Sequence, residues 1–151
     1  MQITAFSLAE RFVGLQEAAG SASSPAVLAM LRLDAAWPEG DDVPWCSAFI
    51  NYVCWLLRLP RSKSLSARSW LAVGEPISLA DAKKGSDIVV LSRGANAPGA
   101  AVLDAPGHVG FFAAMDPEDP KVVWVLGGNQ GDCVSVAPFP IGRMLGVRRL
   151  S

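Results

Sequence analysis

Cys46 and His108 are the residues of this chain best suited to nucleophilic chemistry. Cys46 opens an apolar run directly after a Pro-Trp pair, and His108, the one histidine of the sequence, stands in a Gly-His-Val-Gly segment. A cysteine nucleophile needs a base that turns its thiol into a thiolate. If the chain is a cysteine hydrolase, His108 must be that base, because the sequence contains no second histidine.

The position of Cys46 along its segment favours a nucleophile. Apolar residues recur at helical spacing from 46 to 57, so the sequence predicts a helix over 45–57 with Cys46 in its first turn. Backbone N–H groups and the helix dipole at such an end stabilise a thiolate and can also hold a developing oxyanion. Taken alone, the same residue could instead head a buried apolar stripe.

A third polar group would hold the imidazole in position. The segment 116–121 is rich in Asp, Glu and Pro and joins two predicted strands. A hairpin symmetric about the centre of this loop sets His108 opposite Asn129, with Cβ atoms about 5 Å apart. A bulge at the Gly-Gly pair before Asn129 would shift the pairing by one residue and bring Gln130 into that place instead. Asn129 could also serve only as a turn residue.

Five further residues are expected to contact a substrate. Tryptophans near the site can stack on sugar rings or line a cleft, and glycines let a substrate approach the backbone closely. The expected substrate-binding residues are Trp45, Ser47, Trp70, Gly107 and Gln130. The alternative for an aromatic residue is an ordinary place in the core, which we favour for Trp124.

Other chemistries fit the sequence less well. A structural zinc site would need nearly every cysteine together with the histidine, and Cys46 and Cys54 lack the short spacing of metal ligands, so no metal is expected. Asp41-Asp42 and Glu17 could supply the paired carboxylates of a glycosidase, but adjacent loop aspartates are usually solvated or cap helices. The sequence lacks glycine-rich phosphate loops and a serine nucleophile elbow.

The order of the predicted elements defines the fold class. Helices are predicted in the first half and strands in the second, with a Gly-, Ala- and Pro-rich loop at 93–106. The helices span about 5–17, 25–36 (after a break at 20–25, with Ser24 as cap), 45–57 and 67–73, and the strands about 87–91, 108–115, 122–126, 134–136 and 145–149. This order predicts an α+β fold, with helices packed on an antiparallel sheet, and a single catalytic domain over 1–151.

Composition excludes several functional classes. The chain has 151 residues, 51% hydrophobic and 18% charged, with a net charge of −1, so no basic field points to nucleic acid or anionic lipid. No apolar run approaches the ~20 residues that span a bilayer, and the N-terminus lacks the pattern of a secretory signal. We therefore expect synthesis in the cytoplasm without membrane insertion. Three cysteines do not make a disulfide framework.

Several segments occur in an order that carries a resemblance. The longer segments are Asp42-Val-Pro-Trp-Cys46-Ser-Ala-Phe, Gly107-His108-Val-Gly-Phe-Phe and Val125-Leu-Gly-Gly-Asn129-Gln. The other segments are Val13-Gly-Leu-Gln-Glu17-Ala-Ala-Gly20, Ser69-Trp70-Leu71, Gly85-Ser-Asp87-Ile-Val-Val and Gly146-Val-Arg-Arg. Together they cover nearly the whole chain. The ordered set resembles small papain-like cell-wall hydrolases of the NlpC and CHAP types, especially a compact phage-associated subgroup.

The resemblance implies a papain-like fold that hydrolyses an amide bond of peptidoglycan stem peptides, as an endopeptidase or amidase, without cofactor or metal. It implies Cys46 as nucleophile, His108 as base and then acid, and Asn129 as the third polar residue. In CHAP-type members an acidic residue often stands two places before the third residue. Here that place is Gly127, so the resemblance implies an amide triad.

The resemblance also sets expectations about biology. A hydrolase without a signal peptide can reach the wall as a phage endolysin released through a holin, as an effector injected into a rival's periplasm, or with a phage tail or gene-transfer particle. An effector would have a cognate immunity protein, and we expect a monomer. Two alternatives remain open: a catalytically silent relative that binds peptidoglycan or a protein, and a hydrolase of the same fold acting on an isopeptide or acyl group elsewhere.

Overall fold

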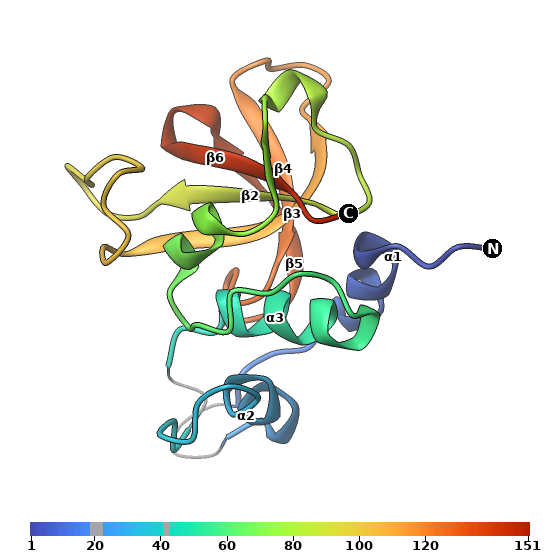
Figure 1. Ribbon diagram of the computed structural model, residues 1–151, viewed down its shortest axis with the longest axis vertical. Coiled ribbons are helices and arrows are strands. Elements are labelled where there is room, and N and C mark those ends of the chain that lie inside the picture. The colour runs from blue at the N-terminus through green and yellow to red at the C-terminus, as the bar shows by residue number, and fades with distance from the viewer. Residues whose placement is uncertain (19–22, 41–42) are drawn as a thin grey trace.

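Six antiparallel strands form one sheet in the computed structural model, which describes residues 1–18, 23–40 and 43–151. In sheet order they are β1 (Glu75–Ile77), β6 (Met144–Arg149), β2 (Asp87–Ser92), β3 (Gly107–Met115), β4 (Val122–Gly127) and β5 (Ser135–Pro140). Most of the helical residues precede the sheet in the chain (Figure 1). This is the α+β arrangement that the sequence predicts.

The described residues contain three α-helices, two of which contact the sheet directly. The three helices are α1 (Ala5–Ala9), α2 (Pro25–Leu31) and α3 (Cys46–Leu57). Short 3₁₀ helices are η1 (Glu10–Phe12), η2 (Ala67–Ala72), η3 (Leu79–Asp81) and η4 (Ile141–Arg143). In Figure 1, α3 lies between α2 and the sheet, and it contacts β3. No helix in the described ranges is long and apolar enough to cross a bilayer.

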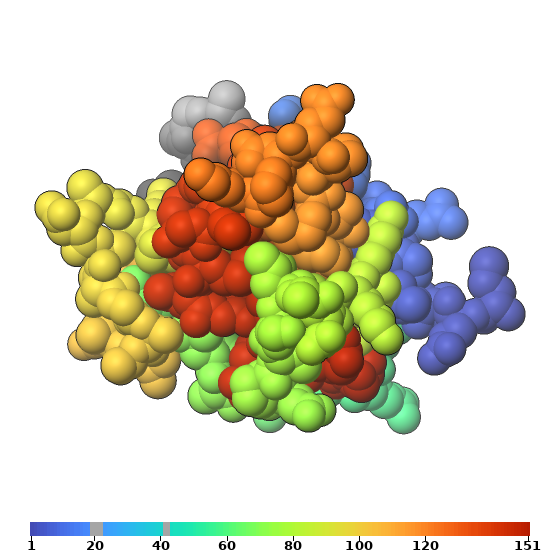
Figure 2. Space-filling model, turned by 90° about the horizontal axis from the view of Figure 1, so that it is seen from above, coloured from blue at the N-terminus to red at the C-terminus, as the bar shows by residue number. Residues whose placement is uncertain are grey.

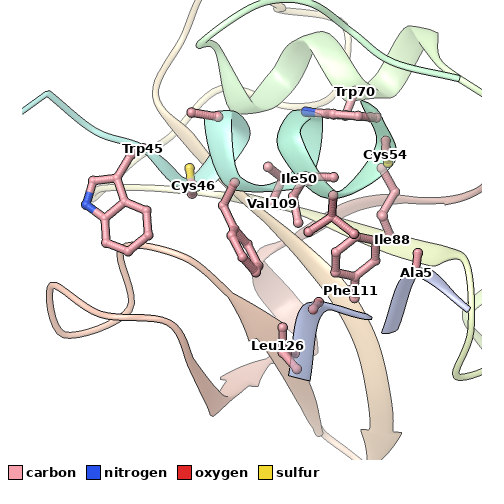
Figure 3. Close-up of a cluster of buried hydrophobic side chains, with 14 of the residues drawn as sticks. Ala5, Trp45, Cys46, Ile50, Cys54, Trp70, Ile88, Val109, Phe111 and Leu126 are labelled. Carbon is pink, nitrogen blue, oxygen red and sulfur yellow. The ribbon is translucent and has the colours of Figure 1, made fainter. Parts of the chain in front are cut away.

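The apolar face of α3 builds the main core. Phe49, Ile50 and Val53 are fully buried and belong to one cluster with Val109 and Phe111 of β3 (Figure 3). Full burial of an apolar side chain of this size contributes about 1.5–3 kcal/mol. The helix that begins with the candidate nucleophile is therefore held firmly against the strand that carries the candidate base.

The structure confirms the third predicted helix and shortens the first two. The segment predicted as helical over 5–17 stops with η1, and the chain then turns at Gly14, whose φ of +97° glycine adopts without steric strain. α2 ends five residues before the predicted end near 36, although the Ser24 hydroxyl caps it as expected. The predicted break at 20–25 lies partly outside the described residues.

Proline marks the strands that the sequence pattern described least well. β1 was missed, and β5 was predicted only over 134–136, whereas it runs to residue 140. Both lie at the edges of the sheet, and they contain Pro76, Pro138 and Pro140. Proline lacks the N–H that a ladder needs and is therefore confined to edge strands. The other four strands lie within one or two residues of their predicted bounds.

Candidate active site

Cys46 is the first residue of α3 and is 3% exposed. Burial raises the pKa of its thiol, and the backbone N–H groups of Val109 and Ser47, which are directed at the sulfur, lower that pKa by less. The resting side chain is therefore a neutral thiol that needs a base. The same N–H groups and the helix end favour the negative charge that develops once a proton leaves.

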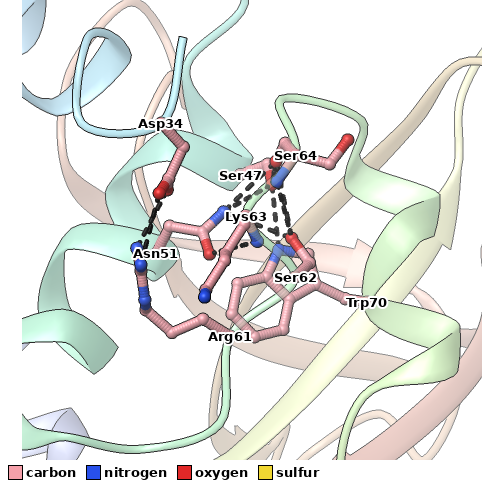
Figure 4. A network of polar contacts seen from close by, with 8 residues as sticks. All are labelled: Asp34, Ser47, Asn51, Arg61, Ser62, Lys63, Ser64 and Trp70. Carbon is pink, nitrogen blue, oxygen red and sulfur yellow. Dashed lines mark hydrogen bonds and ion pairs between the residues drawn. The ribbon is translucent and has the colours of Figure 1, made fainter.

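A buried polar network fixes the first turn of α3 (Figure 4). The Ser47 hydroxyl donates to the Ser64 carbonyl at 2.6 Å and accepts from the Trp70 indole N–H at 2.9 Å. One turn later, Asn51 donates to the same carbonyl at 3.2 Å and accepts from the Lys63 N–H at 3.0 Å. Ser47 and Trp70 are fully buried. This corrects the expectation that they contact substrate, because they support the helix from behind.

Trp45 also faces protein rather than solvent. It is fully buried, and its indole N–H donates to the Glu17 carboxylate at 2.7 Å. Gly128 lies against the ring, since a Cβ at that glycine would come within 2.7 Å of it. The expectation that Trp45 binds substrate is corrected in the same way. Glu17, considered above as a glycosidase carboxylate, is the acceptor of this bond, and Asp41-Asp42 lie outside the described residues.

Gln130 sets the orientation of His108. The Nε2 atom of His108, a residue that is 7% exposed, lies 2.8 Å from Gln130 Oε1. The amide nitrogen of Gln130 donates to the Val125 and Ser135 carbonyls at 3.1 and 2.8 Å. Its oxygen is thereby the acceptor, so Nε2 of the imidazole carries the proton. Nδ1 is then the nitrogen that can take a proton from a thiol.

Gln130 rather than Asn129 holds this place, which corrects the predicted third group. The β3–β4 register near the site is the predicted one, because Phe111 pairs with Leu126. β4 ends at residue 127, however, and Asn129 has a φ of +57°. Its backbone therefore leaves the extended conformation before the ladder reaches His108. The register shift considered above as an alternative at the Gly-Gly pair occurs instead within β3, between Phe112 and Ala114.

His108 is neutral at rest. Burial lowers the pKa of its imidazole, the Gln130 hydrogen bond raises it, and the charges of Arg143 and Arg93 lower it further. Phe139 stacks on the imidazole with 5.2 Å between ring centroids, and the Arg143 guanidinium lies 5.3 Å from the centroid of the Phe139 ring. A neutral imidazole is the protonation state that can act as a base.

The cysteine and the histidine lie in two pockets that share Arg93. One pocket has a volume of about 390 Å³ and is lined by His108, Asn129, Gln130 and Arg143 among others. The other has about 260 Å³ and is lined by Cys46 and Gly107 among others. Val109 links the two residues, since it follows the histidine in the chain and its backbone lowers the pKa of the Cys46 thiol. Within the described residues no hydrogen bond joins sulfur and imidazole, a contact that often tightens only with substrate.

A buried arginine organises the wall of the Cys46 pocket. Arg68 of η2 is fully buried, and in the described part of the chain it donates to backbone carbonyls of the 93–106 loop, which projects from the body of the molecule (Figure 2). The acceptors are Gly99 and Val102 at 2.8 and 2.9 Å, Pro98 at 2.9 Å and Pro106 at 3.0 Å. A Cβ on Gly107 would come within 3.1 Å of the arginine side chain, so this glycine permits the close packing.

Sequence reasoning missed Arg68, Arg93, Phe139 and Arg143. Each acts across a long separation in the chain, and none carries a local pattern that marks it as functional. Across 1–18, 23–40 and 43–151, no three His, Cys, Asp or Glu side chains gather as metal ligands would.

The helices and the antiparallel sheet define an α+β protein, and its fold is similar to that of an NlpC protein of known structure. The structure of NlpC1 from Trichomonas vaginalis superposes on this chain with a TM-score of 0.54 at 14% sequence identity. The match covers 97% of this chain and 42% of that chain, so this chain spans less than half of that protein. At this identity the likeness concerns the fold alone. The sequence matches no protein-family model and no curated protein.

Proposed function

We propose that this chain is a cysteine hydrolase that cleaves an amide bond in peptidoglycan stem peptides, with Cys46 as nucleophile and His108 as general base. One arrangement carries the proposal: a thiol at a helix N-terminus lies beside the strand whose imidazole is fixed through Nε2 by Gln130. That hydrogen bond leaves Nδ1 for the thiol. This is the division of roles that nucleophilic thiol catalysis requires.

In the first half of the reaction, the Cys46 sulfur attacks the carbonyl carbon of the scissile amide while its proton passes to Nδ1 of His108. Substrate binding must bring these two atoms within hydrogen-bond distance. The carbonyl oxygen becomes an oxyanion, which N–H groups in the first turn of α3 stabilise. The imidazolium then protonates the leaving nitrogen, the C–N bond breaks, and a thioester remains on Cys46.

In the second half, water attacks the thioester carbonyl and gives a proton to Nδ1. The C–S bond breaks, the carboxylic acid leaves, and the proton returns to the sulfur. Gln130 holds the Nε2 proton through both halves, so that the same ring nitrogen serves as base and as acid.

Support for peptidoglycan as the substrate comes from the ordered motifs that resemble cell-wall hydrolases, whereas the NlpC-like fold supports a cysteine hydrolase without indicating its substrate. We extend the proposal to a phage endolysin or an antibacterial effector, two settings in which such an enzyme acts on a cell wall. The catalytically silent relative and the hydrolase with another amide substrate are the competing accounts.

Digestion of purified peptidoglycan sacculi tests the proposal. Wild type should release fragments with new stem-peptide amine and carboxyl ends in mass spectra, and Cys46→Ala should release none. Cys133→Ser, which removes a half-buried cysteine outside the pockets, is the matched control and should retain activity. Intact sacculi with a Cys46 that still reacts with an alkylating reagent would favour another amide substrate. Intact sacculi with an inert Cys46 would favour the silent relative.

A further inference from the structure

Two arginines border the candidate site without an acidic partner among the described residues. Arg93 lines both pockets and Arg143 lines the pocket of His108, and among the described residues that line the two pockets none is acidic. The charge of Arg93 acts on Cys46, and the charges of both arginines act on His108. Positive charge of this kind in a pocket that must receive a substrate favours a negatively charged group on that substrate.

Neighbouring groups hold Arg143 in place, whereas Arg93 is exposed, and both guanidinium groups remain available to a ligand. Arg143 donates through Nε to the Ser92 carbonyl at 3.0 Å and lies over the Phe139 ring. This anchors it next to Arg93, which follows Ser92 in the chain. None of the ion pairs within the described ranges includes either arginine. A guanidinium group binds a carboxylate through two parallel hydrogen bonds, which makes it selective for that group.

We propose that Arg93 and Arg143 form a carboxylate-binding subsite beside Cys46 and His108. The enzyme then prefers stem peptides that carry a free carboxylate near the scissile amide over the same peptides with a carboxamide there. The identity of the substrate rests on the proposed function above, whereas the preference for an anion is a property of the two pockets and can be measured without peptidoglycan.

Iodoacetate and iodoacetamide provide this measurement. Both reagents alkylate a thiolate, and they differ only in that one carries a carboxylate and the other a carboxamide. The selectivity ratio is the rate of Cys46 alkylation by iodoacetate divided by the rate with iodoacetamide. Because both rates depend equally on the thiolate fraction, a change in that fraction cancels in the ratio. Compared with a free cysteine peptide, wild type should favour iodoacetate. The ratio should fall by roughly three- to tenfold in Arg93→Gln and in Arg143→Gln. Arg11→Gln, at an exposed arginine that lines a different pocket, should leave it unchanged.

The outcomes separate this proposal from the proposed function. The subsite would be overturned, even if sacculi are digested, if wild type shows the same iodoacetate-to-iodoacetamide rate ratio as the free peptide and neither glutamine variant changes it. A ratio that responds to both variants while sacculi stay intact would support the subsite and reject peptidoglycan. If sacculi are digested, free-acid stem peptides should be cleaved faster than their carboxamides by wild type, and this preference should shrink in the variants.

The imidazole of His108 gives a second readout if burial keeps Cys46 from both reagents. It is the only histidine, so its NMR signals are unambiguous. Acetate bound between the arginines would offset their charges, so the pKa of His108 should rise when acetate is added to wild type. The rise should be smaller in Arg143→Gln. A pKa that ignores acetate in wild type would overturn the proposal.

Discussion

Burial acts in opposite directions on the two reactive side chains of the site. It raises the pKa of Cys46 and lowers the pKa of His108, so each side chain is held in its neutral form. A resting thiolate–imidazolium pair would place two charges in a dry site, whereas a neutral pair places none. In the mechanism that we propose, proton transfer from sulfur to Nδ1 is therefore coupled to attack on the substrate carbonyl.

Gln130, not Asn129, should be the residue that the reaction depends on. Gln130→Ala should lower kcat/KM on the order of 100-fold, because the imidazole loses the group that fixes its tautomer and orientation. The same change should lower the pKa of His108 further, since the hydrogen bond raises it. Asn129→Gly keeps the left-handed backbone and is the matched control. A larger loss of kcat/KM in the control than in Gln130→Ala would contradict the assignment.

Ser47 should contribute to stability and not to substrate binding. Ser47→Ala removes the acceptor of the Trp70 N–H, in a buried bond, and the donor to the Ser64 carbonyl, in a partly buried one. The free energy of unfolding should fall by about 1–3 kcal/mol, while KM for a soluble stem peptide stays within about twofold of the wild-type value. Chemical denaturation and steady-state kinetics on one preparation check both parts. A raised KM without lost stability would restore the role first expected from the sequence.

At the scale of elements, the sequence predicted the helices and strands whose apolar residues follow a regular period. α3 and the central strands follow from helical and alternating apolar spacing, and these elements bring Cys46 and His108 to one region. The third group of the site was misassigned because it depends on where β4 ends and on one left-handed residue, Asn129. Arg68 was invisible because its partners lie 30 or more residues away in an irregular loop.

Arg68 should control the order of the 93–106 loop. Arg68→Met removes every hydrogen bond that this side chain donates to the loop carbonyls. The exposed loop can be rehydrated, so we expect a loss of about 1–3 kcal/mol in the free energy of unfolding together with faster amide exchange confined to residues 93–106. Hydrogen-exchange mass spectrometry distinguishes this from global loosening. An unchanged exchange rate in the loop would show that Arg68 does not hold it.

At the scale of the whole molecule, the buried side chains of His108 and Cys46 make the free energy of unfolding depend on pH on both the acid and the alkaline side. The unfolded chain binds a proton at His108 more readily than the fold does, so this stability is present above the ordinary pKa of 6.5 and is lost as pH falls toward the lowered value. The thiol of Cys46 has the opposite effect. Its contribution to the stability of the fold is present below the ordinary pKa of 9.0 and is lost as pH rises toward the raised value.

Variants at His108 and Cys46 should weaken the dependence of the free energy of unfolding on pH, the first on the acid side and the second on the alkaline side. Denaturation of His108→Gln should show a weaker fall in stability than wild type as the pH falls below about 6.5. Cys46→Ala should show a weaker fall in stability than wild type above about pH 9. Part of the fall that remains comes from Cys54, because burial raises the pKa of its thiol to about 12. Profiles of wild type and variants that run parallel would mean that neither group titrates differently on folding.

The central claim is that hydrolysis passes through the sulfur of Cys46, and graded blocking of that sulfur tests it most directly. The Cys133→Ser protein is treated with iodoacetamide for increasing times, the modified fraction of Cys46 is read by peptide mass spectrometry, and stem-peptide hydrolysis is measured on the same samples. We predict that the remaining activity equals the unmodified fraction of Cys46. Full activity in protein whose Cys46 is completely carbamidomethylated would contradict the account.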